Sequence, residues 1–366
     1  MRFDPLHPGE TGLPAERPGP AGVGTPARPL DREAPQPLAR ETAGEPRWPR
    51  LVCPDCQAAV STESGSAVCA SGHRWAVRDG IARFVPPAGS YADAFGLQWN
   101  TFRRTQLDSH TGTTISRDRA RRCIGEAGWA RLERAPAAQL LEVGCGAGRF
   151  TEVLLSTRAA VTSVDLSTAV DANAASFPQS ARHRVLQADV LHLPFAPRQY
   201  DVVFCLGVVQ HTPSPEQTIA KLYEQVRPGG LLVIDHYPYT VQAYLKTAPL
   251  FRAAFRQLSP ETGMRWTRRV VDFFLPLHEA VRGRRVARSL LARVSPVVNY
   301  YDVLPLTDAQ QREWAFLDTH DALTDYYKHL RTPAQIRGTL EGLGASEVWV
   351  AEGGNGVEAR ARRGEG

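Results

Sequence analysis

Short apolar runs alternate with amphipathic stretches through the middle of this chain. Strands that alternate with helices form a mostly parallel sheet with right-handed crossovers, so the pattern predicts a doubly wound α/β unit. Pro228, Gly229 and Gly230 are expected to end the fourth helix of this unit and to lead into its fifth strand. The expected strands are residues 140–143, 161–164, 185–187, 202–205 and 231–235.

The strand pattern stops after the fifth run. From about residue 240 to 330 no alternation of the strand type is visible, and residues 270–282 and 286–294 have the apolar spacing of helices. We expect this segment to be a helical insertion after the fifth strand. In that position it would lie over the substrate side of the sheet as a lid.

The two ends of the chain have different patterns. A helix over residues 333–343 and two strands, at 346–350 and 356–361, are expected to finish the sheet with an antiparallel hairpin. Residues 1–48, in contrast, are rich in Pro, Gly, Ala and charged residues and have no apolar periodicity. Such a segment cannot offset the entropy of ordering, so it is expected to be disordered.

Length and composition are those of a chain with a large core. The 366 residues, 43% of them hydrophobic, are enough for two or three structural units. The start of the chain lacks the apolar segment of a signal peptide, and no run of about 18 apolar residues occurs, so no membrane span is expected. The six cysteines are unevenly spaced and do not resemble a disulfide framework. We therefore expect a soluble, cytoplasmic protein.

Positive charge gathers in the predicted insertion. The formal net charge is +5, and eight arginines between residues 265 and 293 face only Asp272 and Glu279. Such a patch can attract an anionic partner, such as nucleic acid or a phosphorylated substrate. The arginines are interleaved with Val, Leu and Phe, which is more typical of the solvated face of amphipathic helices. We therefore favour the solvated face over a binding patch.

A glycine-rich loop after the first expected strand is the main candidate for binding chemistry. Residues 144–148 read Gly-Cys-Gly-Ala-Gly, so backbone amides can approach a ligand closely where the next helix begins. The spacing differs from the G-x-G-x-x-G of dinucleotide folds. Asp165 ends the second apolar run, at the position where an open α/β sheet offers a carboxylate to both hydroxyls of a ribose.

These residues resemble the class I S-adenosylmethionine-dependent methyltransferases, in particular those of ubiquinone and menaquinone biosynthesis. The resemblance covers residues 140–234 and implies a Rossmann-like, mostly parallel sheet of seven strands, with S-adenosylmethionine as the methyl donor. Four later segments fit the same pattern in order: residues 187–190, 200–204, 207–211 and 226–231.

The resemblance also implies roles for the matching residues. The loop with Gly144, Cys145, Gly146 and Gly148 would hold the methionine part of the cofactor, and Glu142 would lie near its ammonium group. The other implied contacts are Asp165 to the ribose, Leu166 to one face of the adenine, Asp189 to the adenine amino group, Val190 to a ring nitrogen, and Leu206 and Gly207 to the methionine side.

Two of these assignments have alternatives, and so does one further segment. Asp165 precedes Ser167 and Thr168, so it also fits the N-cap of a helix, although its register with the glycine loop favours the ribose role. Asp189 also fits a residue that caps a turn after a strand. Residues 95–100 either fold over the cofactor or pack as a linker.

An acceptor group that must lose a proton needs a base at the carboxyl edge of the sheet, and histidine is the natural one. His211 follows the fourth expected strand and His236 follows the fifth. His211 also fits a structural helix cap, because its motif occurs with many different acceptors. In the insertion, residues 317–321 and 326–329 mix acids, imidazoles and phenols, which either complete the acceptor pocket or cap helices and face solvent.

A separate segment near the N-terminus has the spacing of metal ligands. Cys53 and Cys56 form a C-x2-C pair, and Cys69 and His73 follow after twelve further residues. Three thiolates and one imidazole satisfy tetrahedral Zn²⁺ with no open position, so we expect structural zinc rather than unligated buried thiols. The segment is too small for a core of its own, so metal binding should drive its folding and chelation should unfold it. It resembles the zinc ribbon of bacterial ribosomal RNA guanine-N1 methyltransferases.

Three functions are compatible with these features. We favour methyl transfer from S-adenosylmethionine to an oxygen or nitrogen of a small-molecule acceptor of natural-product or glycan type. The alternative enzyme is an RNA methyltransferase whose ribbon and basic helices grip a stem-loop. A non-enzymatic scaffold that binds the cofactor is the third, and the intact loop and carboxylate argue against it. The expected domains are an extension at 1–48, a zinc ribbon at 49–90, and a methyltransferase domain at 91–366.

Overall fold

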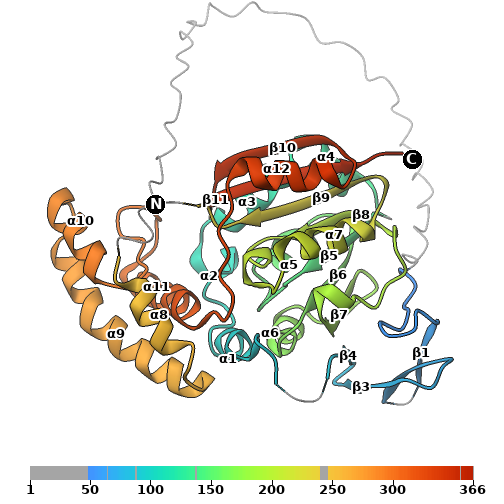
Figure 1. Ribbon diagram of the computed structural model, residues 1–366, viewed down its shortest axis with the longest axis horizontal. Helices are drawn as coiled ribbons and strands as arrows, with labels where there is room; N and C mark the ends of the chain where they lie inside the picture. The colour runs from blue at the N-terminus through green and yellow to red at the C-terminus, as the bar shows by residue number, and fades with distance from the viewer. Residues whose placement is uncertain are drawn as a thin grey trace, which may run out of the picture. The chain divides into compact units, whose positions relative to one another are not determined.

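One sheet runs through the part of the chain that the structure describes. The structure is a computed structural model, and it describes residues 48–63, 65–86, 89–136, 138–239, 246–354 and 356–365. The extension expected at 1–48 lies outside these residues except for Trp48. The strands are hydrogen-bonded in the order β1-β2-β3-β4-β7-β6-β5-β8-β9-β11-β10 (Figure 1). Their bounds are β1 (Val60–Glu63), β2 (Ser66–Cys69), β3 (Arg74–Arg78), β4 (Ile81–Phe84), β5 (Gln139–Val143), β6 (Ala160–Asp165), β7 (His183–Ala188), β8 (Tyr200–Cys205), β9 (Val226–His236), β10 (Ala345–Gly353) and β11 (Gly356–Arg363).

The expectation of seven strands is wrong, because the described residues form a sheet of eleven. β4 pairs in parallel with β7, with Ala82 opposite Leu186, and β1 to β3 continue outward as antiparallel neighbours. The other seven strands are a parallel group, β5 to β9, closed by the antiparallel pair β10 and β11. The N-terminal segment thus extends the sheet of the main domain and does not form a sheet of its own.

Helices cover both faces of the sheet, because consecutive side chains on a strand point to opposite faces. Leu140 and Val202 pack on one face with α3, α4 and α5. Leu141 and Val203 pack on the other face with α7 and α12. The helices outside the insertion are α1 (Asp93–Thr101), α2 (Asp108–Thr111), α3 (Ile115–Ile124), α4 (Glu126–Arg134), α5 (Arg149–Leu155), α6 (Ala169–Ser176), α7 (Pro215–Gln225) and α12 (Pro333–Gly342), with the short 3₁₀ helices η1 (Val190–His192) and η2 (Val209–His211).

The fifth parallel strand begins earlier than expected. α7 ends at Gln225 and β9 starts at Val226, so Pro228, Gly229 and Gly230 lie inside the strand. The pairing of β9 with β8 shifts its register at this point, which lets the strand accommodate a proline and two glycines.

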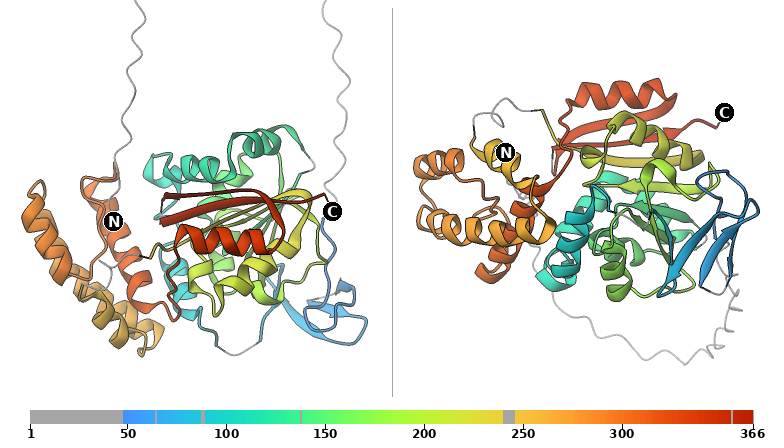
Figure 2. Two further views of the ribbon diagram at one scale, coloured as in Figure 1. Left: turned by 45° about the horizontal axis from the view of Figure 1, so that its top comes forward. Right: turned by 60° about the horizontal axis from the view of Figure 1, so that its bottom comes forward.

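The described part of the chain between β9 and α12 contains no strand and forms four helices: α8 (Ala248–Phe255), α9 (Pro260–Ala280), α10 (Arg285–Val294) and α11 (Asp308–Thr324). Side-chain caps at Ser259 and Thr307 begin the two longer ones. A small core holds them together, formed by Val271, Leu275, Val297, Tyr301, Ala315 and Phe316. Figure 2 shows α9 and α10 to one side of the sheet layers. Among the described helices, none combines the length and the apolar composition needed to cross a membrane.

The five strands β5 to β9 all end at the same edge of the sheet. Their last residues are Val143, Asp165, Ala188, Cys205 and His236. The loops after these strands therefore meet there, and this carboxyl edge is where open α/β sheets bind ligands.

Candidate functional site

The glycine-rich loop lies tightly packed between the ends of β6 and β8. The backbone amides of Gly144 and Cys145 both donate to the carbonyl of Val164, at 2.7 and 3.0 Å. Gly144 has a φ of +75°, and a Cβ at this position would lie 2.0 Å from Cγ2 of Val208. Only glycine fits there, because the backbone is left-handed and the space is already filled.

Asp165 fastens this loop to the end of β6. Its Oδ2 accepts from the Gly146 amide at 3.0 Å, and its Oδ1 accepts from the amide and the hydroxyl of Ser167 at 2.8 and 2.7 Å. The N-cap of α6 is Thr168, so Asp165 does not occupy that position. Burial raises the pKa of Asp165, although the hydrogen bonds from Ser167 and Gly146 oppose this shift. A carboxylate has about four lone-pair sites, so one remains for a ligand hydroxyl.

Asp189 caps a turn, as one alternative expected. Its side chain accepts from the Leu191 amide at 2.9 Å at the start of η1, and Val190 is buried in the core. Burial, together with the carboxylates of Asp189 and Asp165, raises the pKa of the Tyr91 phenol. Tyr91 therefore lies within electrostatic reach of both acids. No motif in the sequence indicated that Tyr91 belongs to this site.

Glu142 is buried beneath the glycine loop. Its Oε2 accepts from the hydroxyls of Thr151 on α5 and Ser163 on β6, at 2.6 and 2.8 Å. Burial raises the pKa of Glu142 to about 7. The carboxyl group thus links β5, β6 and α5 directly behind the loop, and Leu166 at the end of β6 is tied down by Gln187, which donates to its carbonyl at 2.9 Å.

The helix α1 lies over the loop. A Cβ on Gly146 would lie 3.3 Å from the Trp99 indole, and a Cβ on Gly96 would lie only 2.6 Å from the Thr168 hydroxyl at the start of α6. The Asn100 side chain donates to the carbonyl of Thr168 at 2.9 Å. The segment 95–100 is therefore part of a helix that covers the glycine loop. The sequence had offered this segment as a cover for the cofactor or as a linker, without distinguishing Trp99 from its neighbours.

We expect S-adenosylmethionine to change the fluorescence of Trp99, because an indole over Gly146 must adjust to any ligand in the cradle. Titration of the wild-type chain should give a saturable change in emission. A Trp99→Phe variant should lose most of that change, whereas Trp349→Phe, on β10 beside Arg360, should keep it. A full signal from Trp99→Phe would mean that α1 does not report on the cradle.

His211 is held at the carboxyl edge in a defined tautomer. Its Nδ1 donates to the carbonyl of Tyr327 at 3.2 Å and lies 3.3 Å from Oδ2 of Asp325. Since a carbonyl can only accept, Nδ1 carries the proton and Nε2 of the neutral ring is free to take one. Burial would lower the pKa of His211, but the carboxylates of Asp325 and Asp321 outweigh this and raise it.

Asp325 is itself fixed by cations from the insertion. Arg252 on α8 forms an ion pair with this carboxylate, and Lys328 lies 3.4 Å from it. The ring of His211 is flanked by Phe95 on α1 and by Tyr237 after β9, with centroids 5.4 and 5.2 Å away. Lys328 lies inside the polar segment 326–329 that the sequence had marked, and Asp325 directly precedes it. Phe95 belongs to the segment 95–100, which was expected to cover the cofactor or to pack as a linker, whereas Arg252 was not predicted.

His236 differs from His211 in its surroundings. It follows Ile234 at a two-residue interval, so it faces the side of the sheet with α7 and α12. Burial lowers its pKa to about 4, and its Nδ1 lies 3.0 Å from the carbonyl of Tyr237. The neighbouring Asp235 points the other way and accepts from the Gly207 amide at 2.6 Å, which fixes the loop that also contains the buried Leu206.

Several buried polar atoms near this edge have no hydrogen-bond partner among the described residues. They include both amide atoms of Gln210 on η2, Nε2 of Gln98 on α1 and Nε2 of His320 on α11. Gln98 and His320 adjoin one another, with Oε1 and Nδ1 2.6 Å apart. A buried polar group without a partner costs about 1–3 kcal/mol, so this region is built for a polar ligand or for water.

The insertion contributes acids to the same region. Tyr237 donates to Asp321 at 3.3 Å, and Tyr300 donates to Asp318. Burial raises the pKa of Asp318 to about 7. These two acids of α11 therefore face phenols inside the molecule rather than capping the helix or pairing with solvent.

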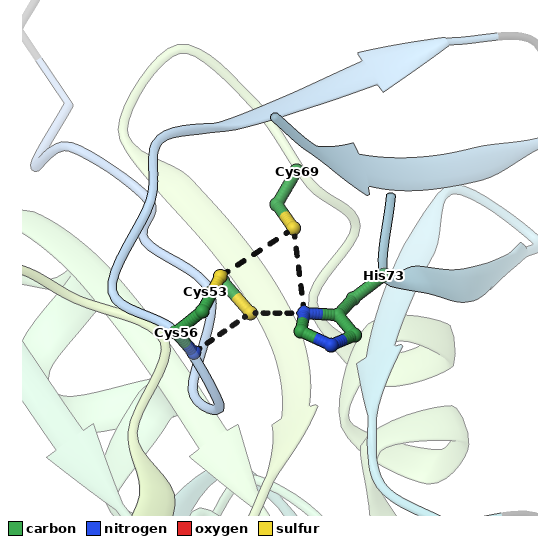
Figure 3. Close-up of side chains that lie close together, drawn as sticks. All are labelled: Cys53, Cys56, Cys69 and His73. Carbon is green, nitrogen blue, oxygen red and sulfur yellow. Dashed lines mark hydrogen bonds between the residues drawn. The ribbon is translucent and has the colours of Figure 1, made fainter. Parts of the chain in front are cut away.

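The expected metal ligands come together in the N-terminal segment. Figure 3 shows Cys53, Cys56, Cys69 and His73 converging, and their ligand atoms all lie within 4.8 Å of one another. Nδ1 of His73 lies 3.3 and 3.6 Å from the sulfurs of Cys53 and Cys69, and the sulfurs of Cys56 and Cys69 are 3.7 Å apart. Zinc–sulfur bonds of about 2.3 Å in a tetrahedron place two sulfurs about 3.8 Å apart, so the four side chains fit the ion.

This segment shares the core of the main domain. Ala82 and Phe84 of β4 belong to the same buried cluster as Leu186 of β7. The Val52 amide donates to the carbonyl of Pro194 at 3.0 Å. The expectation that the segment lacks a core of its own agrees with this packing.

Residues 141–234 match the family model described as "Methyltransferase domain". A ubiquinone biosynthesis O-methyltransferase of Saccharophagus degradans is 36% identical over 118 residues, which cover 31% of this chain and 50% of the relative. A malonyl-[acyl-carrier protein] O-methyltransferase of Enterobacter lignolyticus is 34% identical over 120 residues, covering 31% of this chain and 47% of the relative. The chain spans about half the length of the curated relatives it matches.

The solved structure of the CurJ carbon methyltransferase aligns with 75% of this chain and 61% of its own, at 15% identity and a TM-score of 0.43. This likeness is too distant to carry an argument. The segment with the metal ligands, the helix α1 and the insertion all lie outside the matched residues 141–234.

Proposed function

We propose that this chain, whose residues 141–234 form a methyltransferase domain, transfers the methyl group of S-adenosylmethionine to an oxygen atom of a small-molecule acceptor. The observation that carries the proposal is that His211, whose tautomer is fixed by the hydrogen bond from its Nδ1, lies beside the glycine-rich loop. Phe95 contacts His211 and Trp99 contacts Gly146, and these two α1 residues are one helical turn, about 6 Å, apart. A base and a cofactor cradle therefore flank the same stretch of α1.

The cofactor would be held by the residues that the sequence indicated. Asp165 would accept from one ribose hydroxyl with its remaining lone pair, and the loop of Gly144, Cys145, Gly146 and Gly148 would lie along the methionine part. Glu142, Leu206 and Gly207 would bound that part, and Leu166, Asp189 and Val190 would surround the adenine. When bound, the cofactor supplies a methyl group on a sulfonium sulfur, whose positive charge is lost as the methyl leaves.

His211 would remove the acceptor proton. Its Nε2 would take the proton of the acceptor hydroxyl, which would make the oxygen nucleophilic toward the methyl group that the bound cofactor would supply. The imidazolium so formed is stabilised by the Asp325 carboxylate beside Nδ1. His236, with a pKa of about 4, is the weaker base, and we assign the role to His211.

An oxygen acceptor is supported by the need for a base and by the relatives. A neutral amine attacks a methyl group with its own lone pair and can lose its proton afterwards, whereas a hydroxyl is a poor nucleophile until it is deprotonated. Both relatives described above are named O-methyltransferases. Methylation of nitrogen acceptors or of RNA bases is an outcome that the following test would detect.

The proposal can be tested in two steps. Calorimetry should show binding of S-adenosylmethionine and of S-adenosylhomocysteine to the full chain. The chain is then incubated with the cofactor and with panels of phenols, aliphatic alcohols, amines and structured RNA, and each product is examined for the mass gain of one methyl group. Methylation confined to hydroxyls supports the proposal, whereas methylated amines or RNA, or failure to bind the cofactor, would overturn it.

His211→Ala should lower kcat by about 10²-fold or more, because the acceptor loses its base. Asp325→Asn should lower kcat by about tenfold, since the imidazolium loses its partner. Loss of the Asp325 carboxylate also lowers the pKa of His211, so the acidic limb of the kcat–pH profile should move to lower pH. Asp272→Asn, which removes an exposed carboxylate of α9 paired with Arg312, is the control and should leave the profile unchanged.

We also propose that the cluster of Cys53, Cys56, Cys69 and His73 binds Zn²⁺ in a structural role. All four tetrahedral positions would be filled by side chains, so the ion would have no open site for catalysis. Burial raises the pKa of Cys53 to about 11, whereas the Ser71 hydroxyl lowers that of Cys56 to about 6. Metal binding requires all three thiols to be deprotonated, so acid should release the ion.

A further inference from the structure

The helix α9 exposes a stripe of large apolar side chains. Trp266, Phe273 and Leu277 are 46%, 66% and 43% exposed. They are spaced seven and four residues apart, so they lie along one face of the helix. The opposite face of α9, with Val271 and Leu275, is buried in the small core of the insertion. The packing of α9 against its neighbours therefore does not use the exposed stripe.

The helix α10 is more exposed to solvent than α9. None of its residues is buried. Val286, Leu290 and Val294 are 75%, 57% and 56% exposed, and their spacing of four residues places them along one ridge. Three aliphatic side chains in a row on an exposed helix are unfavourable in water unless another surface covers them.

Unpaired arginines accompany both stripes. Of the eight arginines between residues 265 and 293, Arg282 and Arg288 form ion pairs with acids of the insertion. Within the described residues, the other six have no carboxylate within ion-pair distance: Arg265, Arg268, Arg269, Arg284, Arg285 and Arg293. Arg269 lies over the indole of Trp266, at 4.7 Å from its ring, so charge and apolar surface are directly adjacent.

We propose that α9 and α10, which we call the basic arm, bind the surface of a membrane that contains anionic lipids. An amphipathic helix of this kind lies in the plane of the interface, with its apolar face among the acyl chains and its arginines at the headgroups. The charge is complementary, because unpaired arginines are attracted to acidic lipids and gain from each headgroup they meet. The apolar ridge is complementary to the acyl region.

Two other occupants fit the arm less well. RNA would pair with the arginines, but the aliphatic ridge of Val286, Leu290 and Val294 gains nothing from phosphates. A second copy of the chain would cover the ridge, but a two-fold interface would also bring the unpaired arginines of one arm close to those of the other. Of these three occupants, lipid satisfies both features of the arm.

The inference is tested with the full chain and lipid vesicles. Vesicles of phosphatidylcholine alone and of phosphatidylcholine with phosphatidylglycerol are mixed with the protein, and the bound fraction is measured by flotation. We expect binding only to the vesicles with phosphatidylglycerol, with a blue shift of Trp266 emission that a Trp266→Phe variant lacks. Raising the salt concentration should weaken binding, because the headgroup charges are screened.

Matched variants separate the contribution of the basic arm to vesicle binding from that of the overall net charge. Arg285→Gln with Arg293→Gln should lower the partition coefficient about fivefold for each arginine removed. Val286→Ser with Leu290→Ser should lower it at least tenfold. Arg117→Gln with Arg158→Gln removes the same charge from exposed positions elsewhere and should leave binding unchanged. All these positions are exposed, so the melting temperature should stay the same.

Three results would overturn the inference. The first is equal binding, or no binding, to the two kinds of vesicle. The second is a dimer in light scattering that Val286→Ser with Leu290→Ser dissolves. The third is RNA binding that the variants of Arg285 and Arg293 abolish while vesicle binding persists. The affinity for S-adenosylmethionine is measured in parallel, so failure of the arm and failure of the proposed function remain distinguishable.

Discussion

Gly144→Ala is expected to abolish binding of S-adenosylmethionine and to lower the free energy of unfolding by about 3–4 kcal/mol. The new Cβ would lie 2.0 Å from Cγ2 and 3.1 Å from Cβ of Val208, in a loop whose amides are already bonded to Val164. The loop must move to relieve this contact, and the cradle moves with it. Urea unfolding gives the stability, and calorimetry gives the affinity.

Gly112→Ala is the matched control. Gly112 has a φ of +71°, close to that of Gly144, but a Cβ there would meet nothing within 4 Å. It should therefore show only the cost of a left-handed alanine, about 1 kcal/mol, with cofactor affinity unchanged. If both variants lose the same stability and both bind the cofactor, then the close contact with Val208 does not govern the cradle.

Removal of the metal should destabilise the N-terminal segment as strongly as Gly144→Ala destabilises the glycine-rich loop. We expect one zinc ion per chain in elemental analysis, and a strong chelator or Cys69→Ser should release it. Structural zinc contributes on the order of 10 kcal/mol in small metal-dependent modules, so β1 to β3 should lose their protection from hydrogen exchange. The melting temperature of the whole domain should also fall, because β4 shares its core.

Cys123→Ala is the control for this experiment. Cys123 is also a buried cysteine, but it packs on the face of the sheet with α3 and is not part of the metal cluster. It should keep the full zinc content and normal exchange in β1 to β3. A chain that contains no zinc as purified from metal-replete cells, or that keeps β1 to β3 protected after chelation, would contradict the structural role.

The parallel part of the fold was predictable because its signals are local. Each of the five expected apolar runs lies inside one of β5 to β9, since a strand buried on both faces must be apolar along its length. The number of strands was not predictable. The pairing of β4 with β7 joins residues about a hundred positions apart, and a strand as short as Ile81–Phe84 carries no sign of its partner.

The candidate site likewise contains residues that the sequence predicts and residues that it does not. The glycine loop and Asp165 follow strands directly, so their positions at the carboxyl edge follow from the sheet alone. Tyr91 reaches the edge from the segment before α1, Trp99 from α1 itself and Asp325 from the end of α11. Only tertiary packing brings these three residues there. His211 and His236 could not be separated by sequence, because both follow strands and differ only in their surroundings.

The pairing of β4 with β7 has a consequence for the cell. β7 is a strand of largely buried side chains whose outer edge is covered by β4, and the other strands of the metal-binding segment lie beyond it. If zinc starvation unravels that segment as far as β4, the amides and carbonyls along β7 become an open template for strands of other chains. Metal scarcity would then remove this protein by aggregation, long before strands β5 to β9 have unfolded.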